Sequence, residues 1–123
     1  MAGFVNGFLL VAAGGALGSM ARYGLYRAVP APWGTLGANI LGGFLMGLLV
    51  GVLSGRGLSA DTERLFLGAG VLGGFTTFSA FSLDMVQMLE RGALGEAALY
   101  GVGSTALSIA AVFLGLLLGR VLA

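Results

Sequence analysis

The sequence predicts an all-α integral membrane protein with four transmembrane helices and a break in the third. Of the 123 residues, 58% are hydrophobic and 9% are charged, whereas about 25% of the residues in a soluble domain are charged. Four apolar segments have the roughly 20 residues that a helix needs to cross a bilayer. The third segment contains adjacent glycines and threonines, which predict the break.

The first predicted helix spans residues 4–25 and the second spans residues 34–53, joined by a turn that contains Pro30, Pro32 and Trp33. Proline favours turns, and tryptophan is enriched where a membrane meets water. Glycines recur every four residues on both helices, which predicts close packing or dimerisation. These glycines are Gly14 and Gly18 on the first helix and Gly43, Gly47, Gly51 and Gly55 on the second.

The third predicted helix spans residues 62–89, with a break at 73–77. Adjacent glycines carry a large helix penalty, and the hydroxyls of the threonines that follow compete for backbone hydrogen bonds. The helix is therefore expected to stop near Gly73 and to restart near Thr77. Irregular backbone at membrane depth needs partners from protein or from a water-filled cavity. The break accordingly predicts a buried junction, an ion site or a pore wall.

The fourth predicted helix spans residues 94–118, and the four helices are expected to form a single membrane domain over residues 1–123. Tyr100, Ser104 and Ser108 follow one another at steps of four, which places their side chains along one helix face. A single hydroxyl in a membrane helix often bonds to its own backbone. A row of three can also replace the water around a moving ion.

Three more side chains are candidates for a site, one in the second predicted helix and two directly after the predicted break. Asn39 needs a hydrogen-bond partner in lipid, which either a neighbouring helix or a transport pathway would supply. Phe78 and Phe81 share one helix face directly after the break, although phenylalanines at helical spacing are usually core residues. Free carbonyl groups before a break suit a cation, whereas free N–H groups and ring edges after it suit an anion.

The composition argues against several functions. The chain has no cysteine and no histidine, which excludes disulfides, metal clusters of these residues, thiol nucleophiles and imidazole acid/base chemistry. An enzyme is therefore the least expected class. A net charge of +1 without a basic cluster argues against a nucleic-acid partner.

The distribution of arginines does not predict a single orientation of the chain in the membrane. Four spans place both termini on one side, and the arginines then divide three against three. Because the Lys/Arg bias sets orientation, either one arginine dominates or copies insert both ways and form an antiparallel dimer. The arginines are Arg56, Arg64 and Arg120 on the side of the termini and Arg22, Arg27 and Arg91 on the other.

Three motifs occur in order along the chain. They are Gly-Gly-Ala-Leu-Gly-Ser-Met-Ala-Arg-Tyr at 14–23, Gly-Thr-Leu-Gly-Ala-Asn at 34–39 and Gly-Gly-Phe-Thr-Thr-Phe-Ser-Ala-Phe-Ser at 73–82. Together they resemble the Fluc (CrcB) family of small fluoride channels, and the likeness covers all four spans. The resemblance implies an antiparallel, dual-topology homodimer in the lipid of the prokaryotic cell membrane, through which F⁻ leaves passively so that cytoplasmic fluoride falls.

The resemblance also implies roles for single residues of the anion pathway. Phe78 and Phe81 correspond to phenylalanines whose ring edges meet fluoride, and Asn39 to an asparagine that hydrogen-bonds the ion or orients those rings. Arg22 corresponds to an arginine near an aqueous vestibule, where its charge raises the local anion concentration. The other implied pathway residues are Thr77, Tyr100, Ser104 and Ser108.

A structural Na⁺ at the dimer interface is implied as a cofactor, held by the backbone carbonyls of Gly73 and Thr76 from both subunits. Two other functions remain open from the residues alone. A proton-coupled exporter of the small multidrug type needs a mid-membrane carboxylate, which the first two helices lack. A structural subunit that only packs against other membrane proteins would leave the break and the hydroxyl row unused.

Overall fold

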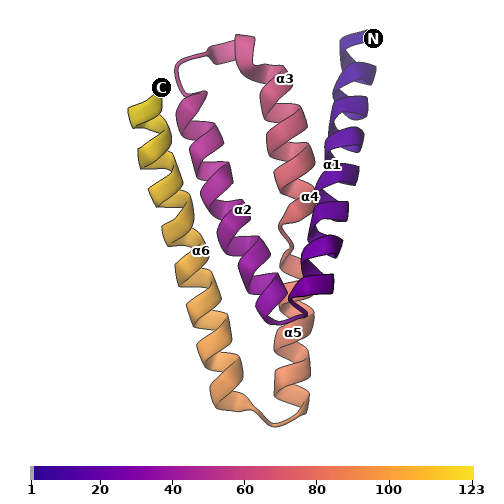
Figure 1. Ribbon diagram of the computed structural model, residues 1–123, viewed down its shortest axis with the longest axis vertical. Coiled ribbons are helices and arrows are strands. Elements are labelled where there is room, and N and C mark those ends of the chain that lie inside the picture. The colour runs from indigo at the N-terminus through magenta and orange to yellow at the C-terminus, as the bar shows by residue number, and fades with distance from the viewer. Residues whose placement is uncertain (1) are drawn as a thin grey trace.

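The structure, a computed structural model, describes residues 2–123, and all regular elements in this range are helices (Figure 1). The first two are α1 (Ala2–Ala28) and α2 (Trp33–Val52), and the last is α6 (Leu94–Leu122). Between them lie the 3₁₀ helix η1 (Gly57–Ala60), α3 (Asp61–Glu63), the π-helix η2 (Arg64–Leu72), α4 (Gly73–Phe75) and α5 (Phe78–Glu90).

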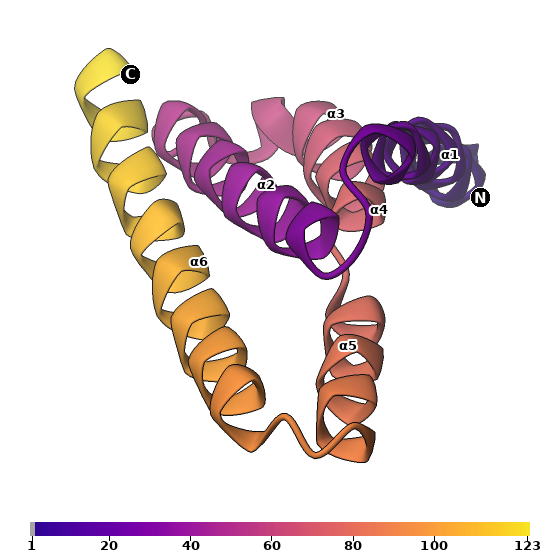
Figure 2. The same cartoon turned by 60° about the horizontal axis from the view of Figure 1, so that its bottom comes forward.

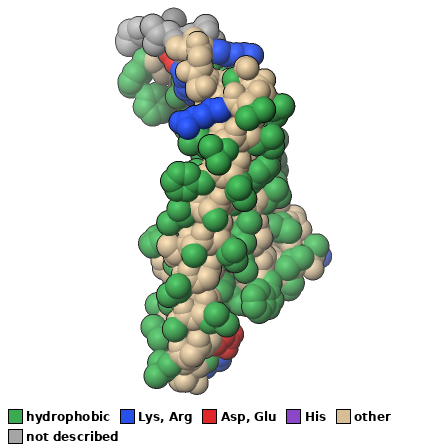
Figure 3. All heavy atoms as spheres, turned by 90° about the vertical axis from the view of Figure 1, so that its left-hand side faces the viewer, with side chains coloured by type: hydrophobic (Ala, Val, Ile, Leu, Met, Phe, Trp, Pro, Cys, Tyr) green, Lys and Arg blue, Asp and Glu red, His purple; other side chains and the backbone are tan. Residues whose placement is uncertain are grey.

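Four helical stretches are long and apolar enough to cross a membrane, in agreement with the predicted all-α membrane fold. They are Gly3–Ala28, Trp33–Val52, Asp61–Glu90 and Leu94–Leu122. Figure 3 shows hydrophobic side chains along the whole length of one face, with most of the charged side chains in view near its two ends. This distribution suits a lipid environment, because a charge at the bilayer centre is costly.

The helices pack mainly as two pairs. In Figures 1 and 2, α2 runs along α6, while α1 lies against η2 and α4. A Cβ added to Gly47 or Gly51 would collide with the backbone of α6, and one added to Gly14 or Gly18 would collide with the backbone of η2. These glycines therefore let the helix backbones touch, as predicted. Gly55 was expected to continue the row, but it lies beyond the end of α2, and a Cβ there would meet nothing within 4 Å.

The third span is interrupted at the threonines. Thr76 (φ −82°, ψ 155°) and Thr77 (φ −153°, ψ 122°) both have extended backbone, whereas α4 keeps Gly73 and Gly74 helical. The helix thus continues further than the glycines alone predicted. The reason is packing, since a Cβ on Gly74 would lie 2.6 Å from the carbonyl oxygen of Gly15 in α1.

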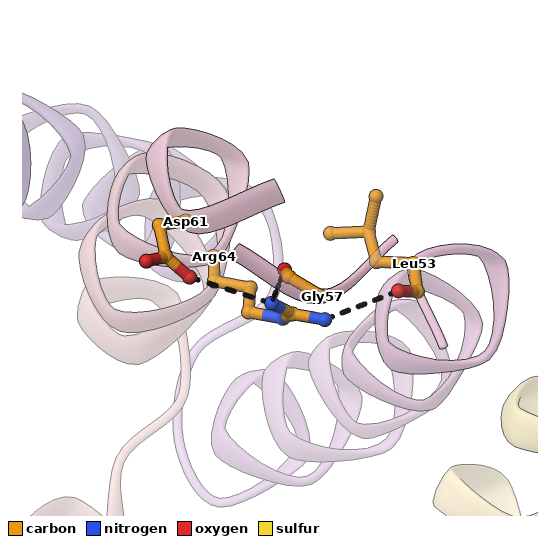
Figure 4. Close-up of polar contacts among 4 residues, drawn as sticks. All are labelled: Leu53, Gly57, Asp61 and Arg64. Atoms are coloured by element: carbon orange, nitrogen blue, oxygen red, sulfur yellow. Dashed lines mark hydrogen bonds and ion pairs between the residues drawn. The ribbon is translucent and has the colours of Figure 1, made fainter. Parts of the chain in front are cut away.

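The connection between α2 and the third span is held by Arg64 (Figure 4). Its Nη2 donates to the carbonyl of Leu53 at 3.1 Å, and its Nη1 donates to the carbonyl of Gly57 and lies 3.4 Å from Asp61 Oδ1. A cation beside the carbonyls at the end of α2 is favourable, whereas the exposed ion pair adds little stability. The guanidinium therefore fixes the turn mainly through the two carbonyls.

The hairpin of α5 and α6 closes the end of the molecule opposite the termini (Figure 1). Gly92 forms its turn with φ 73°, a left-handed conformation that favours glycine. Near the turn, Met88, Ala97 and Tyr100 form a buried cluster, onto which Phe81 packs. In Figure 2, α5 lies apart from α1 and the first half of the third span.

Candidate functional site

A cavity of about 510 Å³ lies where α2, α6 and the interruption of the third span face one another. This is within the range of about 300–1,000 Å³ typical of ligand sites. None of its lining side chains is charged, and the lining combines an amide, hydroxyls and phenyl rings. The lining residues are Asn39, Gly73, Thr76, Thr77, Phe78, Phe81, Ser104, Thr105, Ser108 and Ile109.

Six of the eight residues that the sequence indicated for the anion pathway line this cavity. They are Asn39, Thr77, Phe78, Phe81, Ser104 and Ser108. The structure places the other two beside it. Tyr100 stacks on Phe81 with ring centroids 5.4 Å apart, and Arg22 donates from Nη1 to the Thr76 carbonyl at 3.3 Å.

Asn39 is bonded to the interruption through both ends of its amide. Its Oδ1 accepts from the N–H of Thr77 at 2.8 Å, and its Nδ2 donates to the carbonyl of the same residue at 2.9 Å. An asparagine amide can donate two hydrogen bonds, so one N–H is not used by Thr77. The side chain can therefore hold the backbone and still offer a donor to a ligand.

The two threonine hydroxyls satisfy the ends of the helices on either side of them. Thr76 Oγ1 donates to the Leu72 carbonyl at 3.0 Å, and Thr77 Oγ1 accepts from the N–H of Ala80 at 3.1 Å. Thr77 is thus the N-cap of α5, a position that favours threonine. Ser79 Oγ lies 3.2 Å from Thr77 Oγ1. The hydroxyl of Thr77 is therefore committed to the cap as an acceptor.

Phe78 and Phe81 are placed differently although they share a helix face. Phe78 is 78% exposed within the chain, whereas Phe81 is half-buried between Phe78 and Tyr100. The two rings are 5.6 Å apart and tilted by 41°. A large exposed ring that lines a cavity is not explained by packing of this chain's own core. Phe81 has a core contact in addition to its place in the cavity wall.

Two neighbouring hydroxyls of α6, those of Thr105 and Ser104, differ in their hydrogen bonds. Thr105 Oγ1 donates to the Gly101 carbonyl at 2.8 Å, the usual arrangement in membrane helices. Ser104 is 6% exposed, and its buried Oγ has no hydrogen-bond partner within the described residues 2–123. Buried polar atoms are normally satisfied. A missing partner at the wall of a cavity therefore points to a ligand or water there.

Asp84 is a contact of the site that the sequence did not indicate. It is 6% exposed, and its Oδ2 accepts from the Tyr100 hydroxyl at 2.7 Å. The hydroxyl proton of Tyr100 is thus directed at a carboxylate rather than at the cavity. The only signal in the sequence is a carboxylate inside an apolar span, and its partner on α6 is visible only once α5 and α6 are paired. Thr105 and Ile109 also line the cavity without having been predicted, although each directly follows a predicted serine.

The carbonyls implied for Na⁺ lie at this interruption and fit such an ion in part. Gly73 is exposed and lines the cavity. In a continuous helix its carbonyl would accept from Thr77, which bonds to Asn39 instead. The Thr76 carbonyl already accepts from the Arg22 guanidinium, a cation, and keeps one lone pair. Within residues 2–123 no group of three or more Asp, Glu, His or Cys side chains could hold a metal.

Comparison with known proteins decides the family. The family described as "CrcB-like protein, Camphor Resistance (CrcB)" matches residues 9–116. The chain belongs to the CrcB family.

Relatives of this CrcB-family chain are named fluoride-specific ion channel FluC. The protein of Phenylobacterium zucineum is 54% identical over 94% of this chain and 97% of its own length. That of Agrobacterium fabrum is 58% identical over 90% of this chain and 94% of its own length, and that of Caulobacter vibrioides is 51% identical over 94% and 97%. With four helices able to span a membrane, the chain is a multi-pass protein of the bacterial cell membrane.

Proposed function

We propose that this CrcB-family chain is a fluoride-selective channel, through which F⁻ leaves the cytoplasm down its electrochemical gradient. The observation that carries the proposal is the cavity at the interruption of the third span, which offers neutral hydrogen-bond donors and ring edges and no charged side chain. The names of relatives that are 51% to 58% identical over most of the chain point to the same ion. The protein is a channel and not an enzyme.

The lining residues account for how a small, tightly hydrated anion can lose its water and pass through the cavity. To enter, F⁻ must exchange its water for donors at short range. Ser104 offers a hydroxyl that has no partner among residues 2–123, Asn39 offers an N–H that Thr77 does not use, and the rings of Phe78 and Phe81 offer positive edges. Because no cationic side chain lines the cavity, binding stays weak enough for the ion to leave.

The functional unit is an antiparallel homodimer of dual topology, in which the interruption lies at membrane depth as a break in the third span. Three features support this arrangement. The cavity is open within one chain, Phe78 in its wall is largely exposed, and α5 packs on little besides α6. A second copy would cover these surfaces, and two inverted copies would reproduce the repeat architecture common in transport proteins.

A structural Na⁺ between the two copies completes the proposal. One chain offers two carbonyls, those of Gly73 and Thr76, and a hard cation takes more oxygen ligands than two. Two copies related by a two-fold axis would supply four. The bond from Arg22 to Thr76 places a positive charge near this position, so the ion has to share that oxygen.

The proton-coupled exporter is not favoured, because the cavity wall has no carboxylate and the nearby Asp84 is bonded to Tyr100. The deciding experiment uses purified protein in liposomes loaded with fluoride, with an ionophore to dissipate the voltage and an electrode to record efflux. We expect rapid F⁻ release without a proton gradient and no comparable Cl⁻ release. Absence of F⁻ release, or release only with a proton gradient, contradicts the proposal.

A further inference from the structure

Arg22 is a half-buried cation inside the apolar span Gly3–Ala28. Its Nη1 donates to the carbonyl of Thr76, 54 positions along the chain, at 3.3 Å. No carboxylate among the described residues 2–123 forms an ion pair with it. We propose that Arg22 is the counter-charge for the carbonyl end of the first half of the third span, and that it thereby makes the interruption passable for an anion. The effect on ion flow rests on the proposed function, whereas the contact does not.

The first half of the third span ends with its carbonyl groups directed at the interruption. Its helical residues run from Asp61 to Phe75, and Thr76 after them is extended. The last carbonyl groups of a helix together carry a partial negative charge of about half an elementary charge. The cavity begins directly at this end, because Gly73 and Thr76 line it. An anion in the cavity is therefore repelled by the helix end unless a cation offsets the negative charge.

A glycine of α1 brings Arg22 to that helix end. A Cβ on Gly18 would collide with the carbonyl of Val71 and lie 2.9 Å from the backbone nitrogen of Phe75. Glycine at position 18 therefore lets the backbone of α1 touch the last turn before the interruption. Arg22 follows Gly18 by four residues, so it lies on the same face of α1, about one turn further on. The close packing of the two helices thus places the guanidinium beside the Thr76 carbonyl.

The contact with Thr76 distinguishes this role from attraction of anions to the mouth of a pathway. Arg22 does not line the cavity, and its guanidinium is bonded to the backbone of the interruption. Salt screens exposed charges beyond a Debye length of about 10 Å at 0.1 M, whereas partly buried pairs in contact are screened much less. Attraction at a mouth therefore weakens as salt is added. Neutralisation of the carbonyl end does not.

Isotope-edited infrared spectroscopy tests the contact without reference to transport. A ¹³C=¹⁸O label on the Thr76 carbonyl reports its hydrogen bonding. We expect its amide I band to move to higher frequency in Arg22→Met, which has no donor, and to move less in Arg22→Lys, whose ammonium can still donate. A label on Leu72, whose carbonyl accepts from Thr76, should not move in either variant. An unchanged Thr76 band in folded Arg22→Met would falsify the contact.

Fluoride efflux from liposomes at a fixed Na⁺ concentration tests the charge. We expect efflux about three- to tenfold slower in Arg22→Gln, which is neutral but can donate, and within about twofold of wild type in Arg22→Lys. The ratio of wild-type to Arg22→Gln efflux should be the same in about 0.1 M and about 1 M of an impermeant salt. A ratio that falls towards one in high salt would show action from the mouth, and wild-type efflux in Arg22→Gln would show that the charge is not needed. Either result overturns the proposal.

Arg120→Gln is the matched control, because it removes the same charge from another helix end. Arg120 is exposed in the last turn of α6 and lies outside the cavity wall. The variant should leave the Thr76 band and fluoride efflux at their wild-type values. Equal slowing in Arg120→Gln and Arg22→Gln would show that the net charge of the protein sets the efflux, and the assignment to Thr76 would be wrong. Wild-type efflux, measured first, tests the channel separately from this contact.

Discussion

Residues of the cavity wall differ in the structural contacts that they make besides lining the cavity. These contacts decide whether a substitution changes only ion flow or also stability. Phe78 has little packing to lose, whereas Phe81 also stacks on Tyr100. Ser104 has no partner to lose at all within the described chain, whereas Thr77 caps a helix. Substitutions of Phe78 and Ser104 therefore test the effect on ion flow more directly than substitutions of Phe81 and Thr77.

The phenylalanines give the first prediction. Phe78→Ile and Phe81→Ile remove the ring edges that face the cavity, and we expect each to slow fluoride efflux from liposomes by about two- to tenfold. An aromatic contact contributes about 0.5–1.5 kcal/mol beyond its buried area, and about 1.4 kcal/mol changes a rate tenfold. Phe81→Ile should in addition lower the midpoint of thermal unfolding, because Phe81 packs on the buried cluster.

Phe113→Ile is the control for both variants. Phe113 lies on α6, is 62% exposed and does not line the cavity. It should leave efflux unchanged. Wild-type flux in folded Phe78→Ile would show that this ring has no part in the pathway.

Ser104 gives the second prediction, in which a substitution lowers fluoride efflux without lowering stability. The buried hydroxyl of Ser104 has no partner in the described part of the chain, so Ser104→Ala should keep or slightly raise the unfolding midpoint. Efflux should fall, because a donor is missing from the cavity wall. Ser82→Ala, whose hydroxyl bonds to the Phe78 carbonyl of its own helix at 2.9 Å, is the control and should keep wild-type efflux. A drop in stability without a drop in flux would make Ser104 a structural residue.

Glycines determine how closely the helices of this protein pack, in two different ways. On α2 and α6, glycines at steps of four bring two backbones into contact. In the third span, Gly74 allows the close contact with α1. The extended backbone lies at Thr76 and Thr77, whose hydroxyls hydrogen-bond the ends of the neighbouring helices. The sequence predicts the irregularity at 73–77 from the glycine penalty and the threonine hydroxyls, but the penalty alone does not show which glycines pack against another helix.

The α2–α6 contact gives the third prediction. A Cβ at Gly47 would collide with the carbonyl of Val112, so Gly47→Ala should force the two helices apart and destabilise the protein by about 1–3 kcal/mol. Gly37 lies on the same helix, where a Cβ would meet nothing within 4 Å. Gly37→Ala should therefore be neutral or stabilise the helix by up to about 1 kcal/mol. Unfolding in mild detergent measures both, and equal stabilities would show that the contact is looser than described.

At the scale of the whole molecule, hydropathy predicted the class of fold and the number of spans, because burial in lipid acts on each segment by itself. Helical periodicity also placed Ser104 and Ser108 on one helix face, and both line the cavity. The pairs Asn39–Thr77, Arg22–Thr76 and Asp84–Tyr100 could not be predicted, because each joins different helices whose packing is a tertiary property.

The position of Arg22 changes the count of charges that orient the chain. The sequence predicts Arg22 on the side of the first loop, but Arg22 bonds to Thr76 at the interruption, which leaves Arg27 and Arg91 at that end. Arg56 lies between α2 and η1, Arg64 begins η2 and Arg120 lies in the last turn of α6, so all three belong to the end that holds the termini. A bias of three against two is still small, and orientation follows such a bias only when it is clear. Insertion in both orientations therefore remains the expected result.

Because the chain has no cysteine, a single introduced cysteine gives an unambiguous topology test. Ala31→Cys places a thiol on the exposed turn between α1 and α2, and Gly55→Cys places one in the turn after α2, where the space is open. In intact cells, a membrane-impermeant maleimide should label a fraction of each variant, and the remainder should react only after permeabilisation. The two variants lie at opposite ends of α2, so their accessible fractions should add up to the whole population. Complete labelling of one variant and none of the other would refute dual topology and, with it, the antiparallel dimer.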